Sequence, residues 1–497
     1  MFQNLIDQFV NVGRYCGGLD AENCFGALGS IIWGPFVLIP LLLGTGAVLS
    51  YRLGFLQLFK LGPSLRLALW DRKDPDAQGG DVSQFQALTT ALAATVGTGN
   101  IVGVATAISI GGPGALFWMW ITGIVGMASK YSEAFLGVRY RTTDAKGEIS
   151  GGPQYYLQRG IKGPVGKVLA IFFAIAAVFA SFGIGNMTQG NSISGNVEGS
   201  FGIATWVTGG LLAIMTMLVL VGGIKSIGKV TAALVPAMIV FYVLGAMWIL
   251  IANVSEVPAA VMLIFTDAFS GSAAIGGFAG SALILAIQMG VARGIFSNES
   301  GMGSAAIAAA SAQTTHPVRQ GLVSMTQTFI DTIIVVSFTG LVIITTGVWK
   351  EGPEFAATMT GDAFSHGLPG QWGHIIVTVG LVLFAYSTIL GWAYYGERCI
   401  ERLFGRRGVM PYRIFFSIIV FVGATIPLAA VWNFADVANG LMAIPNLIGL
   451  LLLSGLVAKE TRYYLKHDPK LRADRVKIES FMDGRAGAID TFEKTGE

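Results

Sequence analysis

The stretch ALTTALAATVGTGNIVGVATAI, residues 87–108, decides the fold because it combines two features that rarely occur together. It is long and apolar enough to cross a bilayer, which takes about 20 mostly apolar residues. Its centre holds Gly97-Thr98-Gly99-Asn100, which predicts an interruption of the helix. An unpaired backbone group in hydrocarbon costs several kcal/mol, so such an interruption is tolerated only where protein or a water-filled cavity surrounds it.

Two interpretations of this interruption are open. A glycine kink in a packing helix requires only close contact with a neighbouring helix. The alternative is a binding site, because two glycines around a threonine, followed by asparagine, free several carbonyls and amides and add side-chain oxygens. Such a cluster is typical of the sites for a small cation and a zwitterion in transporters with broken helices.

The composition places this stretch in a polytopic membrane protein. The 497 residues are 53% hydrophobic and 12% charged, whereas soluble domains carry about 25% charged residues. The first thirty residues lack the short basic region and apolar core of a signal peptide, so we expect the N-terminus to remain on the mature protein. Cys16 and Cys24 can form a disulfide if that end faces an oxidising compartment, and Cys399 lies far from both.

Eleven segments are apolar and long enough to be predicted as membrane spans. Their ranges are 31–50, 87–110, 114–137, 165–189, 203–222, 229–252, 279–312, 322–348, 373–396, 411–433 and 436–458. A further apolar segment, 257–269, is too short and carries Asp267, which predicts an interfacial or re-entrant piece. The seventh span is too long for one straight crossing, which indicates an interruption there as well.

The basic residues orient the predicted spans. If the N-terminus lies outside, the segments on the inner side hold 28 of the 32 Lys and Arg residues, in agreement with the bias of positive charge toward cytoplasmic loops. The outer loops carry mainly Asp and Glu. We therefore expect the N-terminus outside and a charged C-terminal tail, 459–497, in the cytoplasm.

The spans divide into two halves after the first one is set aside. Five lie on each side of the 253–278 loop, and an odd number per half places the halves in opposite orientations. In such inverted repeats, paired broken helices hold substrate and ion near the bilayer midplane. The second half offers GVARGIFSNESGMG, residues 290–303, as its break. The expected parts are an outer N-terminus with the first span and an inner loop (1–86), a first repeat (87–252), an outer connection (253–278), a second repeat (279–458) and the tail (459–497).

Charged and polar residues in the second half suggest further roles. Arg293 and Glu299 cost a few kcal/mol at membrane depth unless they are paired or hydrated. We expect them to form a structural ion pair, with Asp331 of the next span as a further partner, in preference to direct contact with a substrate. Polar residues near Asp331 predict the lining of an inner gate or vestibule: Thr326, Gln327, Thr328 and Thr332.

Two other spans carry polar side chains. Ser387 and Thr388 place adjacent hydroxyls about halfway along the ninth span. A lone membrane Ser or Thr usually bonds its own preceding carbonyl, but this pair next to the carbonyls of a broken helix can form an oxygen cage of the kind that hard cations prefer. In the fourth span, Gln189 either binds a substrate or pairs two helices.

Three motifs resemble the sodium:alanine symporter family, also called the alanine or glycine:cation symporters, of bacteria and archaea. They are ATVGTGNIVGVATAI (94–108), GGPGALFWMW (111–120) and RGIFSNESGMGSAAIA (293–308), and the resemblance extends over residues 30–458. It implies an all-α fold of the leucine-transporter type, with one extra N-terminal helix before five plus five inverted helices. It also implies import of alanine or glycine with Na+ across a prokaryotic cytoplasmic (inner) membrane.

The resemblance further implies a set of site residues. The V-G-x-G-N pattern of the fold corresponds to residues 96–100, so amides around Gly99 and Asn100 would receive the substrate carboxylate at the positive end of the following half-helix. The other implied substrate contacts are Thr98, Gln189, Phe296, Ser297 and Trp392. The implied Na+ ligands are the Ala93 and Val96 carbonyls with the Ser387 and Thr388 hydroxyls, and a second Na+ site would use the Thr95 carbonyl and the Asn100 side chain.

Other functions fit the sequence less well, and some remain as alternatives. A glutamine symporter of the same family, coupled to Na+ or H+, is the first alternative, since one methyl group changes selectivity by only about 1–3 kcal/mol. A channel usually needs symmetric rings of charges or carbonyls, which the sequence lacks. The four histidines are scattered, so we expect no transition metal, no cofactor other than Na+ as coupling ion, no enzymatic activity and no nucleic-acid partner. The lipid bilayer is the expected surrounding, and the oligomeric state is left open.

Overall fold

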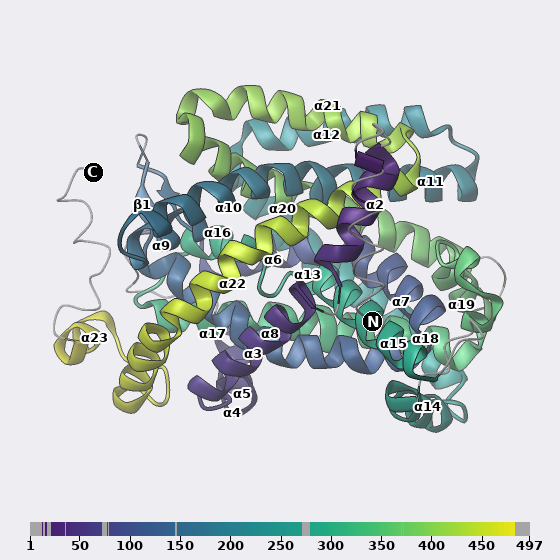
Figure 1. The fold of residues 1–497 in the computed structure, drawn as a ribbon, viewed down its shortest axis with the longest axis horizontal. Helices are drawn as coiled ribbons and strands as arrows, with labels where there is room; N and C mark the ends of the chain where they lie inside the picture. The colour runs from purple at the N-terminus through teal and green to yellow at the C-terminus, as the bar shows by residue number, and fades with distance from the viewer. Residues whose placement is uncertain are drawn as a thin grey trace.

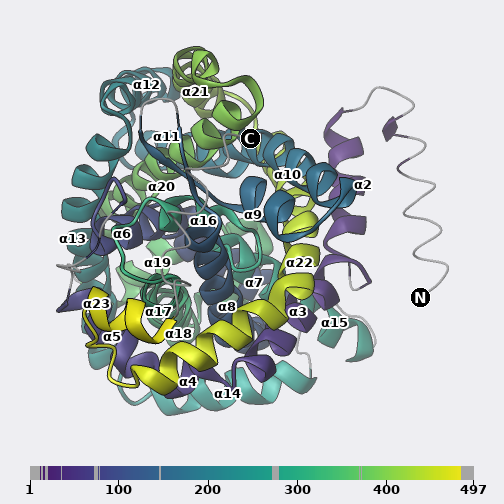
Figure 2. The same cartoon turned by 90° about the vertical axis from the view of Figure 1, so that its left-hand side faces the viewer.

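The computed structural model describes residues 12, 15–16, 21–34, 36–71, 77, 79–144, 147–270, 279–368, 370 and 372–482. Among these residues the structure is almost entirely helical, and one short antiparallel hairpin forms its sheet, β1 (Thr142–Thr143) with β2 (Ile149–Ser150). Residues 271–278 of the predicted connection and 483–497 of the predicted tail lie outside the described part. The expected all-α membrane architecture is confirmed (Figures 1 and 2).

The helices follow one another in a simple order. Those ahead of the first break are α2 (Ala21–Ile32), α3 (Leu38–Arg52), α4 (Leu56–Phe59) and α5 (Leu61–Leu69). Those of the first half are α6 (Gln84–Thr95), η1 (Gly99–Gly103), α7 (Val104–Gly111), α8 (Gly114–Arg139), α9 (Pro153–Gly160), α10 (Pro164–Phe182), η2 (Gly183–Met187), α11 (Thr188–Phe201), α12 (Thr205–Val221) and α13 (Gly223–Ala252).

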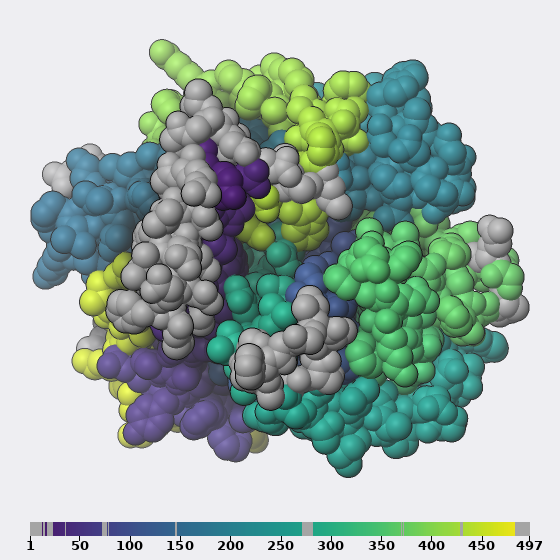
Figure 3. Space-filling view, turned by 45° about the vertical axis from the view of Figure 1, so that its right-hand side comes forward, coloured from purple at the N-terminus to yellow at the C-terminus, as the bar shows by residue number. Residues whose placement is uncertain are grey.

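The rest of the described chain, from the predicted connection to the predicted tail, is also helical. Its elements are α14 (Val257–Ser270), α15 (Ala279–Asn298), α16 (Ser304–Ala310), α17 (Pro317–Thr328), η3 (Phe329–Val336), α18 (Ser337–Thr346), η4 (Val348–Glu351), η5 (Pro353–Phe355), α19 (Met359–Gly367), α20 (Trp372–Phe404), η6 (Arg406–Gly408), α21 (Val409–Thr425), α22 (Leu428–His467) and α23 (Arg475–Met482). The N-terminal α2, purple in Figure 3, packs against the long α22.

Several of these helices qualify as membrane spans. By length and composition, six helices among the described residues can cross a bilayer, and the bent pair Gln84–Thr95 and Gly99–Gly111 makes a seventh. Large apolar side chains point outward on the outer helices, for example Leu218 at 71% and Ile251 at 66% exposure, as expected of a lipid-facing surface. Each predicted span overlaps a helix, while the count of eleven and the two-repeat layout remain predictions.

The first predicted break is confirmed. Helix α6 starts with a capping box in which Ser83 and Gln86 bond each other's backbone N–H groups. It ends at Thr95, and the chain turns by 52° before the next helical segment begins at Gly99. That segment opens as a π-helix, η1. The predicted interruption at residues 97–100 therefore lies at this bend.

The second break is shorter than the predicted stretch 290–303. Residues up to Asn298 remain in α15, and the interruption occupies residues 299–303, where Glu299 has φ of 55°. Gly290 and Gly294 do not end the helix. A Cβ at Gly290 would lie 2.4 Å from the Ala115 carbonyl oxygen of α8, so this glycine serves close helix packing.

Helix α8 packs against α3, α15, α16 and α17 at the centre of the molecule. A Cβ at Gly126 would lie 2.7 Å from the Ser300 side chain, so the absence of a side chain lets α8 approach the second break closely. Helix α10 packs against α20 and α22 on the other side. Both breaks therefore lie inside the helix bundle, where protein groups can satisfy their freed backbone.

Candidate functional site

Asn100 stabilises the first break from within. Its side-chain oxygen Oδ1 accepts a hydrogen bond from the Gly97 backbone N–H at 2.9 Å, and the backbone N–H of Asn100 donates to the Gly97 carbonyl at 3.2 Å. Its Nδ2 donates to Asp331 Oδ1 at 2.7 Å. Asn100 therefore caps the broken helix and also joins it to η3, which the sequence did not predict. The second Na+ site expected at the Asn100 side chain and the Thr95 carbonyl stays a prediction.

Gln189 reaches the first break from the fourth span. Its Oε1 accepts a hydrogen bond from the Thr98 amide at 3.2 Å, while its Nε2 donates to the Ile184 carbonyl at 2.8 Å. Ile184 lies in the π-helix η2, whose wider turn leaves this carbonyl available. Gln189 Oε1 thus accepts a hydrogen bond from the Thr98 N–H that a carboxylate oxygen of an amino acid could also accept.

The four expected Na+ ligands of the first site come together in the structure. Thr388 Oγ1 lies 2.9 Å from the Ala93 carbonyl oxygen and 3.4 Å from that of Val96, and Ser387 Oγ lies 3.3 Å from the Ala93 oxygen. The Phe384 carbonyl, one turn earlier in α20, accepts from both hydroxyls at 2.8 and 3.1 Å. This fifth oxygen was not predicted, although the i−3 and i−4 spacing to the hydroxyls could have indicated it.

This oxygen cluster has more acceptors than donors. Two hydroxyl protons face three buried carbonyl oxygens. The carbonyl of Phe384 also takes part in the helical hydrogen bonding of α20, whereas those of Ala93 and Val96 lie where α6 ends. Buried carbonyls without full hydrogen bonding are costly, whereas a cation would satisfy all of them at once. The chemistry of the donor set therefore fits a small hard cation.

Gly99, Phe296 and Ser297 meet where the two broken helices touch. A Cβ at Gly99 would lie 3.0 Å from Ser297 Cα and 3.2 Å from Phe296 Cδ1. Phe296 in turn stacks on Trp432 with ring centroids 4.7 Å apart. Three predicted substrate contacts that lie far apart in the chain, Gly99, Phe296 and Ser297, are therefore neighbours in the structure.

A substitution at Gly99 tests this contact. We expect Gly99→Ala to lower the melting temperature, since the added methyl must push the two helices apart at a cost of about 1–3 kcal/mol. Gly210→Ala on α12 is the matched control, because its Cβ would meet nothing within 4 Å. Equal melting temperatures for both variants would contradict the close contact at Gly99.

The predicted ion pair between Arg293 and Glu299 is wrong. Arg293 Nη2 pairs with Asp436 Oδ2 of α22 at 3.1 Å, and its guanidinium lies over the rings of Phe296 and Trp432. The two predicted partners therefore contact different neighbours, which no sequence spacing reveals because Asp436 lies on a distant helix.

Glu299 belongs to a separate buried cluster that holds the second break. It accepts hydrogen bonds from Trp392 Nε1 and from Ser304 Oγ, both at 2.6 Å, and its own carbonyl accepts from Lys130 Nζ at 3.0 Å. Nearby, Glu133 Oε1 accepts from the Gly303 amide at 2.9 Å. The structure therefore places the indole N–H of Trp392, expected as a pocket wall, in this cluster.

Asp331 links the two breaks. Its buried carboxylate accepts hydrogen bonds from Asn100 of the first break, from Ser297 at the end of α15 at 2.9 Å, and from Thr332 at 2.8 Å. The sequence identified Asp331 as an unusual charge but assigned it to an ion pair with Arg293. It instead receives neutral donors from three helical segments, so its position depends on both breaks at once.

The polar residues before Asp331 also contact the breaks. Gln327 Nε2 donates to the Ala91 carbonyl at 3.1 Å and to Thr95 Oγ1 at 3.2 Å, and Thr328 lies 3.0 Å from Ser300 between their hydroxyl oxygens. These side chains are fully or nearly fully buried. They were expected to line a gate or vestibule, and the structure shows them as supports of the broken helices.

A cavity of about 460 Å³ opens beside the first break. Its walls come from η1, α11, α19 and α20, and Trp432 is among its lining residues. Because Trp432 stacks on Phe296, the cavity ends next to the contact between Gly99 and Phe296. Figure 1 shows α19, whose residues line part of this cavity, at the right-hand end of the molecule.

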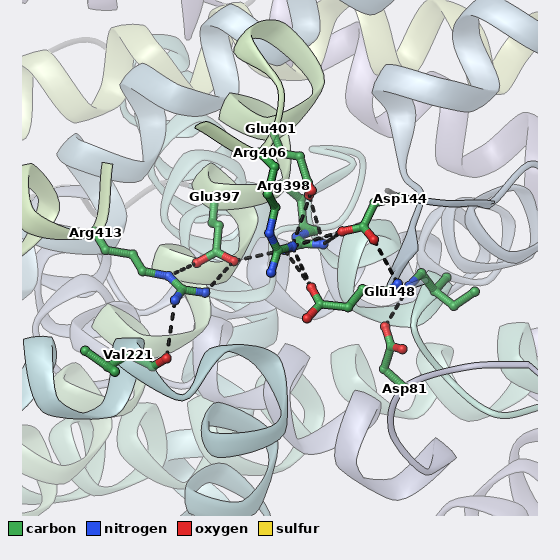
Figure 4. A network of polar contacts seen from close by, with 10 residues as sticks. Asp81, Asp144, Glu148, Val221, Glu397, Arg398, Glu401, Arg406 and Arg413 are labelled. Carbon is green, nitrogen blue, oxygen red and sulfur yellow. Dashed lines mark hydrogen bonds and ion pairs between the residues drawn. The ribbon is translucent and has the colours of Figure 1, made fainter. Parts of the chain in front are cut away.

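The opposite end of the molecule carries a network of ion pairs around the β1–β2 hairpin (Figure 4). Arg398 of α20 pairs with Glu397 at 3.0 Å and with Glu401 at 2.9 Å, and it lies 3.7 Å from Asp144 of the hairpin. Arg413 of α21 binds Glu397 through two hydrogen bonds of 2.7 and 2.9 Å. Together these contacts tie the hairpin, α20 and α21 into one unit.

The same unit holds the ends of both broken helices. Asp81, just before α6, accepts from the Ile149 amide of the hairpin at 2.8 Å. Buried Arg141 donates to the carbonyls of Ala310 and Ala312, which follow the second break, at 2.9 and 2.7 Å. Burial alone would raise the pKa of Glu148 in the hairpin, but the hydrogen bond and the charge of Arg406 hold it below its ordinary value.

Comparison with known proteins agrees with this architecture. A family model described as the sodium:alanine symporter family matches residues 19–478. The chain is 52% identical over 451 residues to the sodium/alanine symporter AgcS of Methanococcus maripaludis, covering 90% of this chain and 98% of that protein. It is 35% identical over 449 residues to the probable sodium/glutamine symporter GlnT of Bacillus subtilis, covering 90% and 91% respectively.

A solved structure shares the fold. The crystal structure of MhsT in complex with L-phenylalanine superimposes with a TM-score of 0.56 at 16% identity, and the match covers 83% of this chain and 98% of that chain. The sequence-based expectation of the fold is thereby confirmed, and so is the family resemblance drawn from the three motifs.

Proposed function

Because this chain belongs to the sodium:alanine symporter family, we propose that it imports a small neutral amino acid, alanine or glycine, together with Na+ by alternating access. The family is one of membrane transporters, and the chain is an integral membrane protein. The observation that carries the proposal is the oxygen cluster between the first break and α20. Its five oxygens supply the hard ligands that Na+ needs, and two of them, the carbonyls of Ala93 and Val96, lie where α6 ends and supplies no further helical N–H.

The amino acid would bind next to this cation. The Thr98, Gly99 and Asn100 amides lie at the start of the half-helix η1–α7, whose positive end favours a carboxylate. The Thr98 amide donates to Gln189 Oε1, so a carboxylate would replace this oxygen as its acceptor. Phe296 and Ser297 would then form the wall against the substrate side chain.

The unequal ends of the molecule support alternating access. The 460 Å³ cavity gives access to the site from the end that carries α19, and the ion pairs of Figure 4 close the other end. Release to the second side would require these ion pairs to separate. A continuous open pore does not fit this arrangement, which disfavours the channel alternative.

We assign the α19 end to the outside. The Cys16–Cys24 disulfide supports this orientation, because disulfides persist in oxidising compartments. The closed end carries many of the basic residues, in agreement with a cytoplasmic location. The two repeats are assigned to residues 87–252 and 279–458, with a broken helix at the start of each.

Uptake into proteoliposomes tests the function. We expect labelled alanine to accumulate only with an inward Na+ gradient, and a membrane potential to add about 2.3 kcal/mol per charge per 100 mV. Competition by unlabelled glycine, D-alanine, serine and glutamine then identifies the substrate, and replacement of Na+ by a proton gradient separates the two coupling ions. Uptake that persists without Na+, or that is blocked by glutamine alone, would contradict the proposal in favour of the alternatives.

A further inference from the structure

A second cavity, of about 600 Å³, is lined by residues at the ends of α8, α22 and α23. Figure 1 places α23 and the β1–β2 hairpin at the same end of the molecule. The cavity is separate from the broken helices. Its walls carry one acidic side chain, Glu460, and four basic ones, Arg139, Lys459, Arg462 and Lys466. This excess of positive charge distinguishes it from the cavity beside the first break.

The charges within this cavity do not balance. Glu460 accepts from Arg139 through Nη2 at 3.0 Å and Nε at 3.1 Å, so the one acid neutralises one base. Lys459, Arg462 and Lys466 form no ion pair within the part of the chain that the structure describes. Among the described residues, the cavity therefore presents three positive charges without an acidic partner, which is the chemistry that attracts an anion.

The face of α22 that leads into the cavity changes from apolar to basic. Leu452, Leu456, Lys459, Tyr463 and Lys466 follow one another at spacings of three and four residues, which places them on one side of the helix. Leu452 is 61% exposed, as on a lipid-facing surface. Tyrosine followed by lysine marks the level at which the hydrocarbon gives way to headgroups.

We propose that this basic cavity binds the headgroup of an anionic phospholipid, with the acyl chains against Leu452 and Leu456. The phosphate would accept hydrogen bonds from Arg462 and from the two lysines, because basic pockets between helices at the cytoplasmic surface suit such headgroups. A soluble phosphate would use the charges but not the apolar face that continues from them. A lipid bound here would hold α22 and α23 together at the end of α8.

Native mass spectrometry of the delipidated full-length protein with phosphatidylglycerol or phosphatidylcholine tests this site. The test variant is K459Q/R462Q/K466Q, and the matched control is K162Q/K167Q/R407Q, which removes three exposed basic groups elsewhere. We expect the wild type and the control to retain phosphatidylglycerol in preference to phosphatidylcholine. The test variant should bind phosphatidylglycerol at least about tenfold more weakly, since each basic group contributes about fivefold near an anionic surface.

The outcomes separate the possible ligands. Equal retention of both lipids by the wild type, or equal loss in test and control variants, would overturn the proposal. Displacement of phosphatidylglycerol by excess inorganic phosphate would also overturn it, because the site would then be one for free phosphate. All three substituted side chains are exposed. Circular dichroism in phosphatidylcholine should give the same helical spectrum for the wild type and both variants, and this checks that the variants are folded.

Discussion

Replacement of Asp331 by asparagine is expected to lower the initial rate of Na+-driven alanine uptake at least about tenfold, since a buried donor left without a partner costs about 1–3 kcal/mol. The carboxylate accepts from Asn100, Ser297 and Thr332. An amide of the same size offers one acceptor and turns its NH2 group toward these donors. The change therefore loosens both breaks at once, and the melting temperature should fall with the rate.

Glu198→Gln is the control for Asp331→Asn, because it removes one carboxylate charge from an exposed position on α11. It should leave rate and melting temperature unchanged. Asp331→Asn with wild-type uptake would show that the link between the breaks is unnecessary. Ser297→Ala, which removes one of the three donors, should give a smaller loss than Asp331→Asn.

The largest effect on ion dependence is expected from S387A/T388A. This double variant removes both hydroxyls of the oxygen cluster and leaves the carbonyls of Ala93 and Val96, at the end of α6, without these donors. Loss of two neutral ligands to a cation should raise the Na+ concentration for half-maximal uptake at least about tenfold, because hydrogen-bonding groups contribute about 1.5–3 kcal/mol each toward a charge. Uptake measured over a Na+ titration at fixed alanine concentration checks this.

A buried hydroxyl elsewhere supplies the comparison for the oxygen cluster. Ser417 on α21 donates to the carbonyl of Arg413 in its own helix at 2.9 Å, so Ser417→Ala should leave the Na+ dependence unaltered. The single variants Ser387→Ala and Thr388→Ala should each shift it by less than the double variant. A double variant with the wild-type Na+ requirement would exclude this cluster as the cation site.

Much of the fold follows from local sequence. Gly97 and Gly99 predict the first break because two glycines flank a polar residue inside an apolar span, and the structure bends there by 52°. The predicted second break, 290–303, is longer than the observed one. Gly290 and Gly294 are glycines in an apolar span, as Gly97 and Gly99 are, but they allow close packing against α8 and do not interrupt the helix. A glycine in a membrane helix allows either a break or a close approach, and only the neighbouring helix decides between them.

The site residues could be predicted from the sequence where they lie in the first broken helix or form the adjacent hydroxyl pair Ser387 and Thr388. Ser387 and Thr388 lie at the carbonyls to which the family resemblance assigned them. The partners of Arg293 and Asp331 could not be predicted, because Asp436 and Asn100 lie on helices far away in the chain. The π-helical turns at η2 and η3 were also missed, since neither Asn186 in η2 nor Asp331 and Thr332 in η3 form a pattern that distinguishes a wider turn from an α-helix.

Coupling between ion and amino acid is the central claim. Na+ on the oxygen cluster and a carboxylate on the Thr98 to Asn100 amides would both order the same four-residue break. Each ligand should then raise the affinity for the other by a factor that corresponds to about 1–3 kcal/mol. Asp331 would extend this effect to the second break through Asn100 and Ser297.

The most direct test is the uptake of radioactive Na+ driven by an inward alanine gradient in proteoliposomes without any initial Na+ gradient. In this account, alanine accelerates Na+ entry into liposomes that hold the wild-type protein, and S387A/T388A abolishes the acceleration at low Na+. Na+ entry that is the same with and without alanine in the wild type would contradict it.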